Sequence, residues 1–141
     1  MGAEGRFSDF TFSDPEGKLG QHLSERSSNL GCVDSKTTYH LEVKASTDED
    51  LSNPFFMSSN QMNMAMDHSS LGRRDRVPAA DVYVVARVYG IVLGGQTHAP
   101  KVCFLVDPWR MMLEDSLKFG ISGKWTLQVS RLLESQHSVP G

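Results

Sequence analysis

One short segment, residues 39–45, alternates apolar residues with residues that could do chemistry, and it reads Tyr-His-Leu-Glu-Val-Lys-Ala. In an extended strand, successive side chains point to opposite faces. We therefore expect His40, Glu42 and Lys44 to share one face, and the apolar residues to be buried on the other. A carboxylate such as Glu42 can bind a hard divalent cation. An ammonium group such as Lys44 can orient a water molecule or neutralise developing negative charge.

A Glu-x-Lys tripeptide also arises by chance on half-exposed strands. There the two side chains form a solvated ion pair that contributes roughly 0–1 kcal/mol to stability. A Glu-x-Lys strand that follows an upstream aspartate is, however, the core of the PD-(D/E)xK nuclease pattern. Upstream aspartates of this chain include Asp9 and Asp14. Both interpretations of Glu42 and Lys44, a surface pair and a polar site, stay open at this point.

Composition narrows the class of protein. A chain of 141 residues has the length of one domain, and we expect that domain over residues 1–134, followed by a polar tail at 135–141. The net charge of −3 gives no global attraction to nucleic acid, so such a partner needs a local basic patch. Cys32 and Cys103 match no zinc-binding spacing and are typical of reduced thiols in an intracellular protein, nuclear or cytoplasmic. Without a long apolar run or a signal-peptide pattern, we expect no membrane partner.

The elements that position Glu42 and Lys44 can be predicted from local patterns. Phe10 and Phe12 lie in a short extended segment, and the Asp-Pro-Glu-Gly sequence at 14–17 is typical of a type I turn. A brief helix is expected around Leu19 and Leu23, followed by a polar loop and then by the strand at about 38–45. Next comes a helix capped by a serine, with apolar residues at helical spacing; its cap is Ser58 or Ser59 and its apolar residues are Met62, Ala65 and Met66.

The second half of the chain carries two strands with continuous apolar, β-branched sequences. Residues 82–89 and 102–106 both have the composition of strands that are buried on two faces. We expect a short helical segment at 109–114, and the segment 124–133 could be either a strand or a helix. With a helix between the strands at 38–45 and 82–89, the order predicts a β-α-β crossover in a mixed sheet flanked by helices, an α/β fold. The expected core residues are Val84, Ala86, Val102, Phe104 and Leu105.

Four ordered motifs allow a comparison with a known family. They are YHLEVKAS at 39–46, PFFMSSNQ at 54–61 with Ala65, DVYVVARVY at 81–89 and VDPW at 106–109. Together they resemble the NO VEIN C-terminal domain family, whose fold is similar to that of the restriction endonuclease-like nucleases. The SDFTF segment at 8–12 resembles the opening of fungal members of the family. The chain has no room for the helix that usually precedes their first strand, so we expect a fragment or a reduced copy.

The resemblance implies roles for four residues. Asp9 matches the first carboxylate of the nuclease pattern, Glu42 matches the second, and Lys44 matches the lysine. Gln61 matches the polar position in the helix that follows. Asp14 competes with Asp9 for the first role, although the position of Asp14 in a turn argues against it.

A function follows from these roles as an expectation. Asp9, Glu42 and the backbone carbonyl of Val43 would hold Mg²⁺ or Mn²⁺, and the domain would hydrolyse phosphodiester bonds of nucleic acid. The two carboxyl groups should then approach within roughly 4–6 Å, close enough to share one cation. The alternative is a non-catalytic module that uses the same fold to bind nucleic acid or protein within a larger chain.

Basic residues outside the Glu-x-Lys pair are candidates for binding nucleic acid. Arg73, Arg74 and Arg76 could contact a phosphate backbone, although the sequence favours a solvated loop. His40 could contact a substrate or could be an ordinary exposed histidine of a strand. Possible partners also include a second copy of the chain and other domains of a parent chain.

Overall fold

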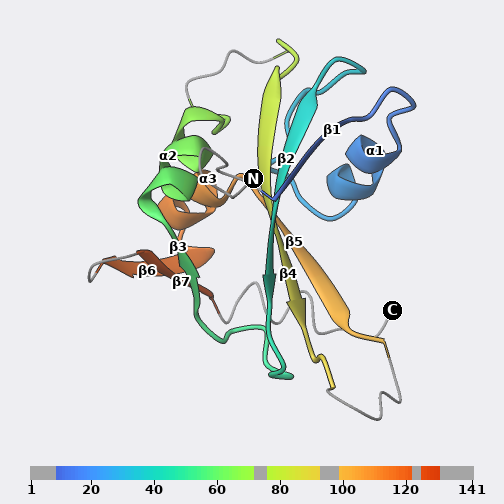
Figure 1. The fold of residues 1–141 in the computed structure, drawn as a ribbon. Helices are drawn as coiled ribbons and strands as arrows, with labels where there is room; N and C mark the ends of the chain where they lie inside the picture. The colour runs from blue at the N-terminus through green and yellow to red at the C-terminus, as the bar shows by residue number, and fades with distance from the viewer. Residues whose placement is uncertain (1–8, 72–75, 93–98, 122–124, 131–141) are drawn as a thin grey trace, which may run out of the picture.

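A mixed sheet of four strands forms the centre of the fold, which belongs to the α/β class (Figure 1). Its strands are β1 (Phe10–Ser13), β2 (Thr38–Ala45), β4 (Asp81–Tyr89) and β5 (Lys101–Val106), in the order β1-β2-β4-β5. The central strands β2 and β4 are parallel, whereas both edge strands pair antiparallel with their neighbours. The structure is a computed structural model that describes residues 9–71, 76–92, 99–121 and 125–130.

A second, antiparallel sheet of three strands lies beside the first. It consists of β3 (Phe55–Met57), β6 (Leu117–Ile121) and β7 (Trp125–Val129), in the order β3-β7-β6. The segment at 124–133, which the sequence left undecided, is therefore a strand over its described part. Neither β3 nor β6 was predicted, because β3 has three residues and β6 contains Gly120 and a lysine, which weaken the strand signal.

Three helices cover the two faces of the four-stranded sheet (Figure 1). Helix α1 (Lys18–Ser24) lies on one side, and α2 (Ser59–Asp67) and α3 (Pro108–Leu113) lie on the other. The path from β2 through α2 to the parallel strand β4 confirms the predicted crossover. Among the described helices, none is long and apolar enough to cross a membrane.

Alternate residues of β4 belong to two different hydrophobic cores. Tyr83 and Val85 pack in the larger core, against α2, α3 and the second sheet. Val82 and Val84 pack in the smaller core, together with Leu23 of α1. These four residues of β4 are all buried, so the prediction that this strand is buried on both faces is confirmed.

The prediction for β5 was only partly right. Leu105 is fully buried, as are Val84 and Ala86 of the neighbouring strand. Val102, in contrast, is 50% exposed, and Phe104 is only partly buried against the smaller core. The sequence of β5 suggested a central strand, but β5 is an edge strand of the described sheet, and apolar side chains near its start gain little cover.

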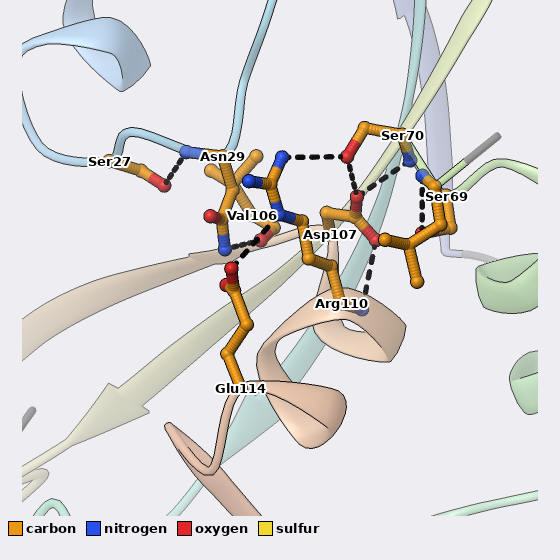
Figure 2. Close-up of polar contacts among 9 residues, drawn as sticks. Ser27, Asn29, Ser69, Ser70, Val106, Asp107, Arg110 and Glu114 are labelled. Atoms are coloured by element: carbon orange, nitrogen blue, oxygen red, sulfur yellow. Dashed lines mark hydrogen bonds and ion pairs between the residues drawn. The ribbon is translucent and has the colours of Figure 1, made fainter. Parts of the chain in front are cut away.

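A buried polar cluster fixes the start of α3 to the loop that follows α2 (Figure 2). Asp107 caps α3 in a left-handed conformation (φ 57°) and is 2% exposed. Its carboxylate accepts hydrogen bonds from the backbone N–H and the hydroxyl of Ser70, each at 2.7 Å, and from the backbone N–H of Arg110 at 3.2 Å. Arg110 in turn donates to the Ser70 hydroxyl at 3.1 Å. The cluster satisfies the buried carboxylate and holds the two loops together.

Candidate metal centres

The pairing of β1 with β2 brings Asp9 beside Glu42. Phe10 pairs with Leu41 in the antiparallel register, so the next position along each strand sets Asp9 opposite Glu42. The Asp9 carboxylate accepts a hydrogen bond from the backbone N–H of Val43 at 2.8 Å and also hydrogen-bonds with the Glu42 side chain. The two carboxyl groups are therefore neighbours that act on each other electrostatically, although a helix and a long loop separate them in the sequence.

Glu42 is a buried acid, and its environment shifts its pKa. The pKa of Glu42 is raised to about 6: burial is the largest cause, the Lys44 ammonium lowers the pKa, and the charge and hydrogen bond of Asp9 raise it. The Glu42 side chain is only 6% exposed, so the alternative of a solvated surface pair is wrong for Glu42. A carboxyl group that sits beside a second carboxylate in a buried position is electrostatically suited to a bound cation.

The ammonium group of Lys44 has polar partners on two sides. Lys44 Nζ lies 3.5 Å from Glu42 Oε2 and donates a hydrogen bond to Gln61 Oε1 at 3.2 Å. Gln61 is in the first turn of α2, where the same Oε1 accepts the backbone N–H of Ser58 at 2.9 Å. The start of α2 therefore positions the ammonium group, and the structure brings together Asp9, Glu42, Lys44 and Gln61.

The burial of the two faces of β2 corrects the sequence-based expectation. The apolar face of β2 was expected to be the buried one, with His40, Glu42 and Lys44 on the other face. In the structure α2 covers the polar face, and the apolar face is buried only in its first half: Tyr39 is fully buried and Leu41 partly buried, whereas Val43 is 36% exposed and Ala45 is exposed. The physical reason is that the crossover from β2 to β4 carries α2 over the polar face.

Asp14 has a different role from Asp9. Its carboxylate accepts hydrogen bonds from the backbone N–H groups of Leu19 at 3.1 Å and Gly20 at 2.8 Å, within the first turn of α1. The predicted turn is present, since the Gly17 N–H donates to the Asp14 carbonyl at 3.0 Å. Asp14 follows the end of β1 that lies away from Asp9, so it does not compete for the place beside Glu42.

Tyr83 is a site residue that sequence reasoning missed. It lies in β4 directly beside His40, and its hydroxyl is close enough to Glu42 and Asp9 for both carboxylates to contribute to its pKa. Burial raises the pKa of Tyr83, and the charges of Glu42 and then Asp9 raise it further. A tyrosine within an apolar strand gave no signal in the sequence; only the parallel register of β2 and β4 reveals it.

A second group of ligating side chains gathers at the other end of the same face. His40 Nε2 lies 2.8 Å from Asp81 Oδ1, and His68 Nδ1 lies 3.9 Å from Asp81 Oδ2. The rings of His40 and His68 stack with their centroids 4.6 Å apart. One ligand atom from each of the three residues lies within 4.8 Å of the others, so this group could hold a metal ion.

The structure changes the interpretation of His40, and it describes only Arg76 of the three arginines in the basic loop. The His40 side chain is only 12% exposed, so it is not an ordinary exposed histidine of a strand. His68 and Asp81 gave no signal because they are far from His40 in the sequence. Arg76 is exposed, whereas Arg73 and Arg74 lie outside the described residues. The two cysteines, Cys32 and Cys103, are free thiols.

Comparison with known proteins found no matching family model, no matching curated protein and no matching solved structure. The resemblance to the NO VEIN C-terminal domain family therefore stays a prediction from the four sequence motifs.

Proposed function

We propose that the chain is a metal-dependent nuclease-like domain in which Asp9 and Glu42 bind one Mg²⁺ or Mn²⁺ ion. The observation that carries the proposal is that the Asp9 and Glu42 carboxyl groups lie side by side. Lys44 Nζ lies 3.5 Å from Glu42 Oε2. The donor set fits the ion, because hard divalent cations prefer carboxylate and carbonyl oxygens. The order Asp…Glu-x-Lys along the chain further supports the proposal.

Each residue of this group has a distinct task in the proposal. Asp9 and Glu42 supply the carboxylate ligands, and the carbonyl of Val43 supplies a further oxygen. A bound divalent ion supplies an acidified water and neutralises charge on a phosphate. Lys44 orients that water or balances the negative charge that develops, and Gln61 keeps the ammonium group in position. Asp9 is exposed, so a phosphodiester substrate can approach from the β1 edge.

The alternative function is a non-catalytic module that binds nucleic acid or protein. A specific observation favours it: Glu42 is buried and Lys44 already donates to Gln61, so the group is closed before any ligand binds. In this alternative the acidic pair and the lysine would serve only to join β1, β2 and α2.

A cleavage assay with a lysine pair of variants separates the two functions. Single- and double-stranded DNA and RNA are incubated with the protein and Mg²⁺ or Mn²⁺. We expect Lys44→Ala to abolish cleavage while the fold persists, and Lys44→Arg to rescue poorly, because a planar guanidinium does not replace a compact ammonium. Lys36→Ala, at an exposed lysine, is the matched control and should cleave like the wild type.

A binding measurement without substrate tests the metal ligands. Mg²⁺ should raise the melting temperature of the wild type at pH 8, since a ligand that binds only the folded state stabilises it. Asp9→Asn and Glu42→Gln should abolish this increase. If the wild type neither cleaves any substrate nor responds to Mg²⁺ or Mn²⁺, the nuclease proposal is wrong and the binding module is favoured. If Lys44→Ala cleaves as well as the wild type, the activity belongs to other residues.

A further inference from the structure

The end of the sheet face that carries His40, His68 and Asp81 brings together three elements. His40 is in β2, His68 follows the last turn of α2, and Asp81 begins β4. The three residues are separated by long stretches of sequence, and the crossover from β2 through α2 to β4 assembles them. None of them belongs to the Asp9–Glu42–Lys44 group, so this group of side chains is independent of the proposed nuclease site.

The geometry of the three side chains is close to that of a metal site. Tetrahedral zinc with bonds of about 2.0–2.1 Å places neighbouring ligand atoms about 3.3 Å apart. The distance from His40 Nε2 to Asp81 Oδ1, 2.8 Å, and the distance from His68 Nδ1 to Asp81 Oδ2, 3.9 Å, lie on either side of this value. All three ligand atoms already lie within 4.8 Å of one another, so side-chain movements of about one ångström bring them toward the spacing of a metal site.

One observation beside the cluster itself points to a bound ligand. A cavity of about 150 Å³ adjoins the group and is lined by Asp67, His68, Ser69, Ala80 and Asp81. This cavity has room for an ion and for water molecules that complete its coordination.

The electrostatic state of the ligands is also favourable. Burial lowers the pKa of His68, the Asp81 charge raises it, His40 lowers it, and Asp67 raises it. A neutral imidazole is the form that binds a metal. The His68 side chain is 23% exposed and that of Asp81 is 36% exposed, so an ion can reach both from solvent.

We propose that His40, His68 and Asp81 bind one transition-metal ion of the zinc class, which joins β2, the end of α2 and the start of β4. Two imidazoles and one carboxylate are typical ligands of Zn²⁺, Co²⁺ and Ni²⁺, whereas Mg²⁺ prefers oxygen ligands alone. The site therefore differs in metal class from the acidic pair at Asp9 and Glu42. Asp67, which lines the same cavity, is placed to interact with a metal-bound water.

The test is a titration of the full chain with Co²⁺ followed by absorption, and with Zn²⁺ followed by calorimetry. We expect saturation at one equivalent and cobalt bands in the visible range, which report nitrogen and oxygen ligands in a four- or five-coordinate site. His68→Gln and Asp81→Asn should each weaken binding at least about tenfold. Both positions are partly exposed, so the two variants should keep the fold, which circular dichroism verifies.

Two control variants exclude binding by other histidines. His22→Gln removes a partly exposed histidine of α1, and the double variant His98→Gln/His137→Gln removes the two histidines that lie outside the described residues. Both controls should bind Co²⁺ like the wild type. Zn²⁺ should also raise the melting temperature of the wild type more than that of His68→Gln. The proposal is wrong if the wild type binds no stoichiometric Co²⁺, or if His68→Gln and Asp81→Asn bind it with unchanged affinity.

Discussion

The position of Glu42 suits a bound cation but lowers the stability of the fold when the carboxyl group is ionised. The fold buries this carboxyl group and sets it against a second carboxylate, and a single ammonium group compensates both. Because burial raises the pKa of Glu42 to about 6, the folded state holds a proton on this acid more tightly than the unfolded state does. The protonated acid therefore stabilises the fold, and this stabilisation is lost as the pH rises from about 4.5 through about 6.

Glu42→Gln should consequently stabilise the protein at pH 8. The pKa change from 4.5 to about 6 corresponds to about 2 kcal/mol, which is the upper limit of the expected gain. Glutamine has nearly the same shape, carries no charge, and can donate a hydrogen bond to Asp9. At pH 4, where Glu42 is protonated in both states, the variant and the wild type should unfold with similar free energies. Urea unfolding at the two pH values measures the difference.

A matched substitution separates this effect from a general effect of removing a negative charge. Glu114 pairs with Arg110 at 3.2 Å on the surface, and Glu114→Gln should change the free energy of unfolding by less than about 1 kcal/mol at either pH. If Glu42→Gln destabilises the protein at pH 8, the pair with Lys44 outweighs the burial of Glu42, and the site is structural rather than poised for a cation.

At the scale of residues, the sequence predicted which side chains share a face but not how deeply they are buried. The period of two in residues 39–45 correctly placed His40, Glu42 and Lys44 together. Their burial depends on α2, which covers them from a distant part of the chain. Tyr83 and Asp81 join the two groups through the register of β2 and β4, and His68 joins through its place at the end of α2. The single sequence did not predict either arrangement.

Among the elements, α2 has the strongest connection to the candidate site. Ser58 caps the helix by accepting the backbone N–H of Gln61 at 3.1 Å, and Gln61 returns a contact to the backbone N–H of Ser58. The same Gln61 oxygen accepts from Lys44. The reciprocal cap of α2 is therefore also the support for the lysine, and any loosening of the helix start reaches the site.

Ser58→Ala should destabilise the protein by about 1 kcal/mol, because the alanine removes the side-chain acceptor of a helix cap. Ser59→Ala is the matched control, since Ser59 is the first helical residue and is exposed, and alanine favours helix at that position. Thermal unfolding of the two variants, monitored by circular dichroism, should show a lower melting temperature for Ser58→Ala alone. Equal melting temperatures for both variants would contradict the reciprocal cap.

Elements with strong local signals were predictable, and those that depend on a partner were not. The serine cap of α2 and the alternation of β2 are local signals, and both were recognised, although the cap was left open between Ser58 and Ser59 and the end of α2 was not predicted. The strands β3 and β6 are short, and they are stable only because β7 pairs with each of them. Arg87, buried in β4, donates to the Lys44 carbonyl at 2.9 Å and to the Asn53 carbonyl at 3.3 Å, contacts that its sequence neighbours do not suggest.

On the scale of the whole molecule, the α/β class and the crossover were predictable, but the division of the core was not. The larger core includes residues from α2, α3 and the second sheet, and the smaller core lies under α1. Both cores include residues of β4, and these residues alternate along the strand. Because β4 contributes to both cores, unfolding of this strand disrupts the two cores together. A substitution that destabilises one core should therefore also affect the other.

We therefore expect the two cores to unfold in one cooperative transition, and Leu23→Ala tests this. Leu23 is fully buried in the smaller core, so its truncation should cost about 2–5 kcal/mol. With a slope of about 1–3 kcal/mol per molar urea, the midpoint should fall by about 1–2 M.

Trp109 and Trp125, the two tryptophans of the chain, pack against the larger core and report on it by fluorescence. If the cores unfold together, the fluorescence midpoint of Leu23→Ala falls as far as the circular dichroism midpoint, whereas Leu113→Ala, at an exposed leucine, shifts neither appreciably. A fluorescence midpoint that stays at the wild-type value would instead show that α1 and its core unfold separately.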